Sequence, residues 1–137
     1  MMLKLKSQGY APVLIFSESI KMFFERRDLD LRQNAHRPFL DKYHSNWIID
    51  DDYFLIPTFY LKGDSAVVGN GRHRITLLSK HTKLFPIAFE GYKNEPNESQ
   101  INLYKKLVHC SLPQDYVYDF PDLEIEDLGE DVGKFRI

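Results

Sequence analysis

The sequence predicts a single mixed α/β (α+β) domain in which a small mixed sheet is flanked by helices. Its 137 residues are enough for one domain with one hydrophobic core and too few for two ordinary domains. Apolar residues make up 43% of the chain and charged residues 28%, a balance typical of globular proteins. Short β-branched and aromatic runs alternate with segments whose apolar residues recur at helical spacing, and this alternation predicts the mixed class.

The first predicted elements are a strand followed directly by a helix. The run Val13–Phe16 is β-branched and aromatic, as strands are. Ser17 is a candidate N-cap for the helix, and Glu18 favours its first turn. The apolar residues of this helix lie at helical spacing, at Ile20, Phe23 and Phe24. A second helix is predicted to start near Pro38.

The middle of the chain predicts a hairpin, a helix and a strand. The extended segment Tyr53–Tyr60, the turn Lys62–Ser65 and the return Ala66–Val68 form the predicted hairpin. The aromatic residues of Tyr53–Tyr60 favour core packing over the alternative of base stacking. A helix is expected over Arg72–Lys80 and a strand over Leu84–Phe89.

The last third of the chain combines a helix with an acidic tail. The loop Asn94–Ser99 has helix-start chemistry, and the helix after it has apolar residues at Ile101, Tyr104, Leu107 and Val108. The structure of the tail from Pro113 onward is left open. Residues 95–137 carry a net charge of −6, against +3 for residues 1–47. The tail is either a solvated extension or a segment that docks on a partner or on the basic body, and its apolar residues favour docking.

Composition also bears on the compartment. The single cysteine, Cys110, excludes an intramolecular disulfide framework, fits a reducing cytosol and is expected to be a buried small apolar residue. The N-terminal segment has no apolar run of signal-peptide length, and no apolar run reaches the roughly 20 residues that span a bilayer. We therefore expect a cytoplasmic protein with no membrane partner. The net charge of −2 argues against coating nucleic acid by bulk attraction.

The segment that indicates chemistry is the junction between the predicted hairpin and the helix after it. Gly69, Asn70 and Gly71 allow a tight turn, and the first turn of the following helix offers unpaired N–H groups to an anion. Arg72 and Arg74 add bidentate donors suited to phosphate. His73 lies between them and carries an imidazole. The stretch predicts a phosphate-binding site.

Three other interpretations of this segment are a dinucleotide-binding loop, a Walker A loop and a plain turn. The segment is neither a dinucleotide fingerprint, because Arg74 stands where the third glycine would be, nor a Walker A loop. It could be a plain turn followed by a helix with exposed arginines. Cations at a helix N-terminus oppose the helix dipole, however, and such a local cost often marks function.

The order strand, Gly-x-Gly-Arg-His-Arg, helix, strand resembles the ParB/sulfiredoxin-like fold, whose Gly-x-x-Arg phosphate-binding element would here be residues 71–74. More narrowly, the chain is similar to plasmid fertility inhibition factors and the related oncogenic suppression protein. The resemblance covers about residues 12–90, which would form the ParB/sulfiredoxin-like core, with residues 91–137 as a C-terminal helix and acidic tail. It implies a bacterial cytoplasmic protein encoded by a plasmid or another mobile element.

The resemblance carries over to particular residues. Gly71 and Arg74 match the ends of the phosphate element, and His73-Arg74 matches the pair that follows the catalytic cysteine of sulfiredoxins. Arg72 occupies that cysteine position, so sulfiredoxin chemistry is not expected. Members of the superfamily bind or hydrolyse nucleotides, and some are assigned nuclease activity. The fertility-inhibition branch blocks conjugative DNA transfer by acting on the transfer machinery or on the transferred DNA.

Two functions therefore remain open. One is a fertility-inhibition protein that binds nucleotide or nucleic-acid phosphate and, if catalytic, hydrolyses an NTP or a phosphodiester. Arg72 and Arg74 would then stabilise phosphoryl charge, with His73 as general acid or base. Arg32 and Arg37 could line the same pocket or form a solvated face. The other is a non-catalytic inhibitor that docks on a protein partner.

Metal chemistry receives little support from the sequence. The five histidines include no ligand pair at helical spacing, and no zinc site is expected. A magnesium ion could arrive with a nucleotide, since hard cations prefer carboxylate and phosphate oxygens. Its candidate ligands are the carboxylates of Asp50, Asp51, Asp52 and Asp64. The alternative, which the sequence favours, is that these residues belong only to a solvated loop and a β-turn.

Overall fold

The computed structural model describes residues 2–25, 48–49 and 52–120. These residues form nine strands, which are β1 (Met2–Lys6), β2 (Ala11–Phe16), β3 (Ile48–Ile49), β4 (Tyr53–Leu55), β5 (Thr58–Lys62), β6 (Ser65–Asn70), β7 (Leu84–Tyr92), β8 (Val108–Ser111) and β9 (Val117–Asp119). The helices of the same residues are α1 (Glu18–Phe23), α4 (Arg72–His81) and α5 (Glu98–Leu107). The mixed α+β class predicted from the sequence is confirmed. The second helix, predicted near Pro38, lies outside the described residues.

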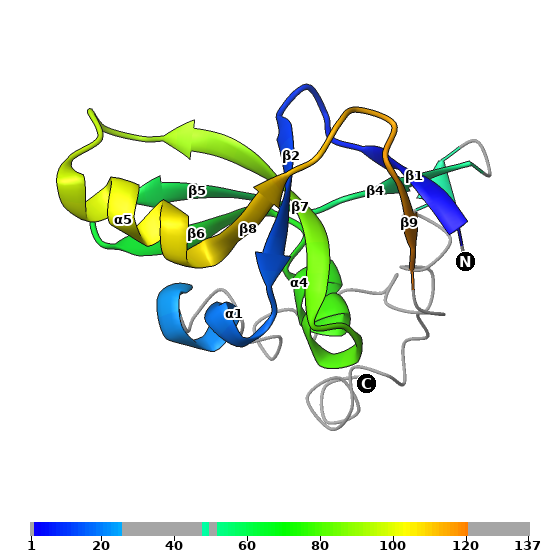
Figure 1. The fold of residues 1–137 in the computed structure, drawn as a ribbon, viewed down its shortest axis with the longest axis horizontal. Coiled ribbons are helices and arrows are strands. Elements are labelled where there is room, and N and C mark those ends of the chain that lie inside the picture. Colours follow the sequence, from blue (N-terminus) through cyan, green and yellow to red (C-terminus); the bar gives the residue numbers. More distant parts are fainter. Residues whose placement is uncertain (1, 26–47, 50–51, 121–137) are drawn as a thin grey trace, which may run out of the picture.

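The strands form two mixed sheets, where the sequence predicted a single small one (Figure 1). The larger has the order β6-β5-β7-β2-β8 and the smaller the order β3-β4-β1-β9. Each contains one parallel pair, β5 with β7 and β1 with β4, among antiparallel neighbours. Figure 1 shows α5 near β5 and β8 and α4 beside β7, and both helices contact those strands.

The division into two sheets arises at Ile56 and Pro57, inside the segment expected to be continuous from Tyr53 to Tyr60. The amide of Ile56 donates to the carbonyl of Lys6 in the small sheet, whereas the carbonyl of Pro57 accepts from Ala88 in the large one. Proline has no N–H to continue a ladder, so the chain changes sheets at this point. The break places the end of β4 beside the start of β5.

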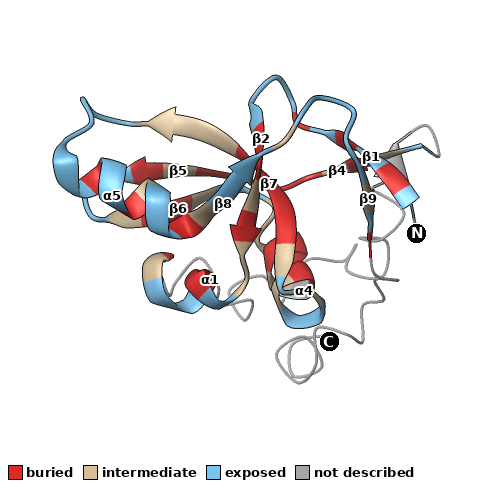
Figure 2. Ribbon diagram, in the orientation of Figure 1, coloured by how far each residue is buried: buried red, intermediate tan, exposed pale blue. Residues whose placement is uncertain are grey.

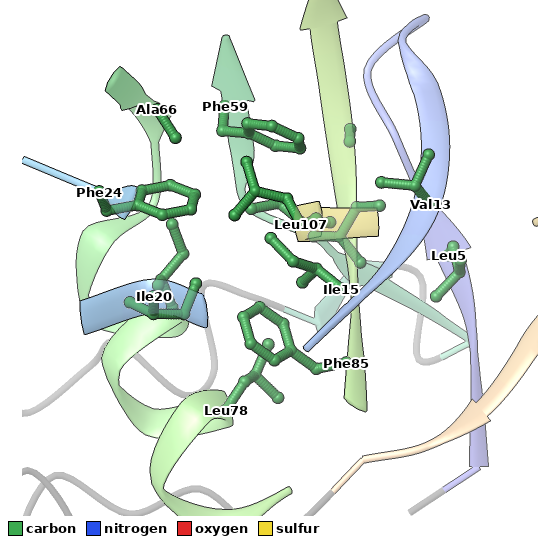
Figure 3. Packing of buried hydrophobic residues seen from close by; sticks show 14 of the residues in the cluster. Leu5, Val13, Ile15, Ile20, Phe24, Phe59, Ala66, Leu78, Phe85 and Leu107 are labelled. Atoms are coloured by element: carbon green, nitrogen blue, oxygen red, sulfur yellow. The ribbon is translucent and has the colours of Figure 1, made fainter. Parts of the chain in front are cut away.

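One hydrophobic cluster joins both sheets and all three helices of the described chain. Figure 3 shows side chains from α1, α4 and β7 meeting, among them Ile20, Leu78 and Phe85. The small sheet contributes Phe54, which stacks on Phe120 with ring centroids 4.1 Å apart. Figure 2 shows the buried residues concentrated where the strands and helices face each other. Residues outside 12–90 also enter this core, at Leu3, Leu5, Leu103, Leu107 and Phe120.

Several local expectations differ from the structure. Ser17 does precede α1, but its hydroxyl makes no cap bond and donates instead to the carbonyl of Thr82, at 2.5 Å. Helix α5 ends at Leu107, and Val108 begins strand β8 instead of continuing the helix. Cys110, expected to be buried, is exposed because it lies on this strand at the edge of the large sheet.

Candidate functional site

Strand β6 continues through Gly69 and Asn70, which the sequence placed in a turn, and Gly71 alone separates it from helix α4. Gly71 is the N-cap residue with φ 92° and ψ 40°, a left-handed conformation that a residue with a Cβ adopts only at a cost. No side chain caps the helix, and its first turn contains no acidic residue. The first turn of α4 therefore supplies no negative charge of its own to the positive end of the helix dipole.

Arg74 folds back beneath this turn and does not extend into solvent. Its side chain is 4% exposed, and Nη1 donates to the carbonyl of Leu55 at 2.5 Å. A Cβ added to Gly71 would lie 2.5 Å from Nη2 and 2.7 Å from Cζ of Arg74. The glycine is thus needed twice, for its positive φ and for the close approach of the guanidinium. The alternative of an exposed arginine at this position is wrong.

The buried guanidinium has an unusual electrostatic environment. Loss of solvent lowers the pKa of Arg74 from its ordinary value to about 10, and no carboxylate of the described residues offsets that loss. Its Nε is buried and finds no hydrogen-bond acceptor among the described residues. A buried cation is expensive unless an anion neutralises it. A bound anion would therefore offset the cost of burying the Arg74 charge.

The two residues between Gly71 and Arg74 differ in exposure. Arg72 is partly exposed on the first turn of α4, and its carbonyl accepts from Thr76 Oγ1 at 2.9 Å. His73 is buried, with 5% of its surface exposed. The other arginines of the predicted site, Arg32 and Arg37, lie outside the described residues.

Sequence reasoning missed a carboxylate beside the turn. Glu90 of β7 lies against Gly69, where an added Cβ would overlap its Oε2 and lie 2.6 Å from Thr58 Oγ1. The buried Thr58 hydroxyl donates to the same Oε2 at 2.5 Å. Lys93 reaches the other carboxylate oxygen, with Nζ 3.8 Å from Oε1. The signal that could have found Glu90 is an acid inside an otherwise apolar strand.

Of the four carboxylates suggested as magnesium ligands, Asp52 and Asp64 lie within the described residues. Asp64 lies in the turn between β5 and β6, at the opposite end of that hairpin from Gly69, and accepts a hydrogen bond from Ser99. Asp50 and Asp51 lie outside the described residues. Within the described ranges, no group of three His, Cys, Asp or Glu side chains could hold a metal ion.

Comparison of the chain with models of protein families, with curated proteins and with solved structures found no match. A separate search of the described residues for membrane spans found no helix with the length and apolar character to cross a bilayer. The site's own geometry therefore has to carry the functional assignment.

Proposed function

We propose that residues Gly69–Arg74 bind a phosphate group of a nucleotide or a nucleic acid. The observation that carries the proposal is the buried guanidinium of Arg74, which lies under the helix N-terminus and has an Nε without an acceptor among the described residues. A phosphate oxygen can accept from guanidinium and backbone N–H groups together, and its charge suits both. A neutral ligand would leave the cation uncompensated.

The biological setting of the proposal comes from the Gly-Arg-His-Arg resemblance. It supports a plasmid- or mobile-element-encoded protein of the ParB/sulfiredoxin-like type that inhibits DNA transfer, with DNA or a component of the transfer machinery as its partner. Magnesium would arrive with a bound nucleotide. If the protein hydrolyses its ligand, Arg72 and Arg74 would stabilise charge on the phosphoryl oxygens, and His73 would transfer the proton.

Titration calorimetry tests the binding proposal. Inorganic triphosphate, nucleoside triphosphates with Mg²⁺ and a single-stranded oligonucleotide are titrated into the wild type and into Arg74→Met, which keeps the volume of the side chain and removes its charge. We expect at least one of these ligands to bind, and the substitution to weaken that binding about tenfold or more, since hydrogen bonds to charged groups contribute about 1.5–3 kcal/mol.

Two controls make the calorimetry decisive. Lys105→Ala removes one positive charge from an exposed position on α5 and should leave affinity unchanged. Circular dichroism melting shows whether Arg74→Met is folded, and Arg74→Lys keeps the charge without the planar fork. Binding that is equal in wild type and Arg74→Met would place the ligand elsewhere.

Phosphate release during the same incubations separates an enzyme from a binding protein. Turnover by the wild type that disappears in Arg74→Met supports an NTP or phosphodiester hydrolase. Ligand binding without turnover supports an inhibitor that acts by occupying its target. Turnover that survives the substitution would show that catalysis uses a different site.

A further inference from the structure

A groove of about 680 Å³ lies at the opposite end of α4 from Gly71, where the last turn of α4 meets the end of β2. Its lining contains the ammonium groups of Lys80 and Lys83 and the imidazole of His81, against the single carboxylate of Glu18. All four residues are exposed. The groove therefore presents an excess of positive charge to its surroundings.

The helix end explains only part of this charge. Lys80 lies in the last turn of α4, where the helix dipole favours a cation, but Lys83 lies beyond the C-cap Thr82. The terminal carbonyls also have donors from within the chain. The carbonyl of Leu78 accepts from the amide of Thr82 at 2.9 Å and from its hydroxyl at 2.6 Å, and the carbonyl of Thr82 accepts from Ser17. The positive charge of the groove is therefore suited to an anionic group from elsewhere.

An acidic segment of the chain begins beside this groove. The hydroxyl of Tyr118, in β9, donates to the carbonyl of Leu84, which lines the groove, at 2.5 Å. Residue 121 follows three positions after Tyr118, which is at most about 11 Å along the chain. Residues 121–137 contain six acidic and two basic side chains, a net charge of −4. Their charge is thus opposite to that of the groove.

We propose that residues 121–137 dock in this groove and set their carboxylates against Lys80 and Lys83. The proposal does not depend on phosphate binding at the other end of α4. The occupant is this segment, and not a second copy or a separate acidic protein, because a short tether gives an effective concentration on the order of millimolar. Exposed ion pairs are individually weak, so the tether decides which anion they hold.

The apolar residues of the segment match the remaining surface of the groove. Residues 123–126 alternate leucine or isoleucine with glutamate, so an extended chain directs the apolar and acidic side chains to opposite sides. Phe16 and Leu84 add apolar surface to the lining, and both are partly exposed. A segment of this pattern can cover apolar surface and meet the lysines together.

Limited proteolysis of the full chain with thermolysin, which cleaves before leucine and isoleucine, tests the docking. Mass spectrometry measures the rate of cleavage within residues 121–129. Lys80→Glu combined with Lys83→Glu should raise this rate about fivefold, the effect of replacing two exposed ion pairs by repulsion. The matched control, Lys62→Glu combined with Lys105→Glu, alters two exposed lysines on β5 and α5 and should leave the rate unchanged. Circular dichroism melting shows that each variant is folded.

Charge reversal in the segment completes the cycle. Glu124→Lys combined with Glu126→Lys should speed cleavage in the otherwise wild-type chain, because these lysines meet a cationic groove. The same pair should slow cleavage when it is added to Lys80→Glu and Lys83→Glu. Opposite effects in the two backgrounds cannot come from the sequence preference of the protease. Equal cleavage rates in all of these proteins would overturn the proposal and leave the segment solvated or reserved for a separate partner.

Carbodiimide coupling of lysine amines to carboxylates identifies the occupant. A mixture of unlabelled and ¹⁵N-labelled full-length protein is coupled, and the linked peptides are mapped by mass spectrometry. Links from Lys80 or Lys83 to residues 122–131 within one molecule support the proposal. Links that join labelled to unlabelled chains would show that a second copy supplies the acidic segment. Links distributed equally over the groove lysines and Lys105 would show no docking, and either result would overturn the proposal.

Discussion

Arg74 has two opposing effects on the stability of the fold. Its hydrogen bond to Leu55 stabilises the junction of the two sheets, whereas the burial of its charge destabilises the fold. Because folding lowers the pKa of Arg74 to about 10, the folded state holds that proton less tightly than the unfolded state. The charge therefore costs stability at neutral pH, and the cost is relieved only as pH rises above about 10, where the folded state begins to lose the proton that the unfolded state still holds.

This balance predicts the effect of Arg74→Met on stability. The substitution loses one hydrogen bond and removes the buried charge, so the free energy of unfolding without ligand should change by about 1 kcal/mol or less. Arg74→Ala also leaves a cavity and should cost about 2–3 kcal/mol. Urea unfolding of the three proteins measures both changes. A large loss in Arg74→Met would mean that the guanidinium mainly supports the fold.

Gly71 permits a second prediction at the residue scale. Gly71→Ala must accept φ 92° and displace the Arg74 guanidinium, so it should destabilise the protein by about 2–4 kcal/mol and abolish phosphate binding. Gly63→Ala has φ 58° and nothing within 4 Å of its new Cβ, so it should cost only about 1–2 kcal/mol. Chemical denaturation compares the two variants. Equal losses would show that the guanidinium moves aside freely.

At the scale of elements, helix α5 is tied to the β5–β6 hairpin by a buried amide. Gln100 is fully buried, and its Nε2 donates to the carbonyl of Gly63 at 2.9 Å and to Asn94 Oδ1 at 3.1 Å. The N-cap Asn97 accepts from the amide of Gln100 at 2.9 Å, so helix start and tertiary contact coincide. This arrangement fixes the strand β5 that carries Thr58 and Tyr60.

We expect Gln100→Leu to lower the free energy of unfolding by about 1–3 kcal/mol, because it removes the hydrogen bonds that the Gln100 amide donates to the carbonyl of Gly63 and to Asn94 Oδ1. Asn102→Leu on the same helix alters an exposed residue and should change stability by less than about 0.5 kcal/mol. Thermal melts followed by circular dichroism distinguish them. A Gln100→Leu protein as stable as wild type would show that this network is dispensable.

At the scale of the whole molecule, the two ends of the described chain meet in the small sheet. Strand β1 pairs with β9, with Met2 opposite Asp119, and the buried ring of Phe120 stacks on Phe54. Phe54 in turn precedes Leu55, the residue whose carbonyl holds Arg74. The small sheet therefore helps to position Arg74, the residue on which the proposed phosphate site depends, through residues that lie far apart in the sequence.

Phe120→Ala should reduce the free energy of unfolding by about 3–5 kcal/mol, the usual cost of removing a buried aromatic ring. It should also weaken phosphate binding, because β4 loses the packing that positions Leu55. Tyr116→Ala removes an aromatic ring that is 37% exposed and should have a much smaller effect on either property. Denaturation measures the change in stability, and calorimetry measures the change in phosphate affinity. Unchanged binding in a destabilised but folded Phe120→Ala protein would show that packing in the small sheet does not affect phosphate binding.

Local sequence patterns predicted most of the elements around the site. Strand β2, the β5–β6 hairpin and helix α4 all follow from apolar periodicity and turn chemistry, which act over a few residues. The glycine turn and the arginines after it were also recognisable, because a tight turn before a cationic helix start breaks ordinary helix preferences. Strands β8 and β9 were missed because they are short and depend on pairing with distant partners.

The sequence by itself determined the mixed class, the order of the elements near the turn and the presence of guanidinium groups at a helix start. Only the tertiary structure decided that Arg74 is buried, that Glu90 lies against Gly69 and that the strands divide into two sheets. The physical reason is that periodicity and turn propensity are local, whereas burial and the approach of charges depend on packing between residues far apart in the chain.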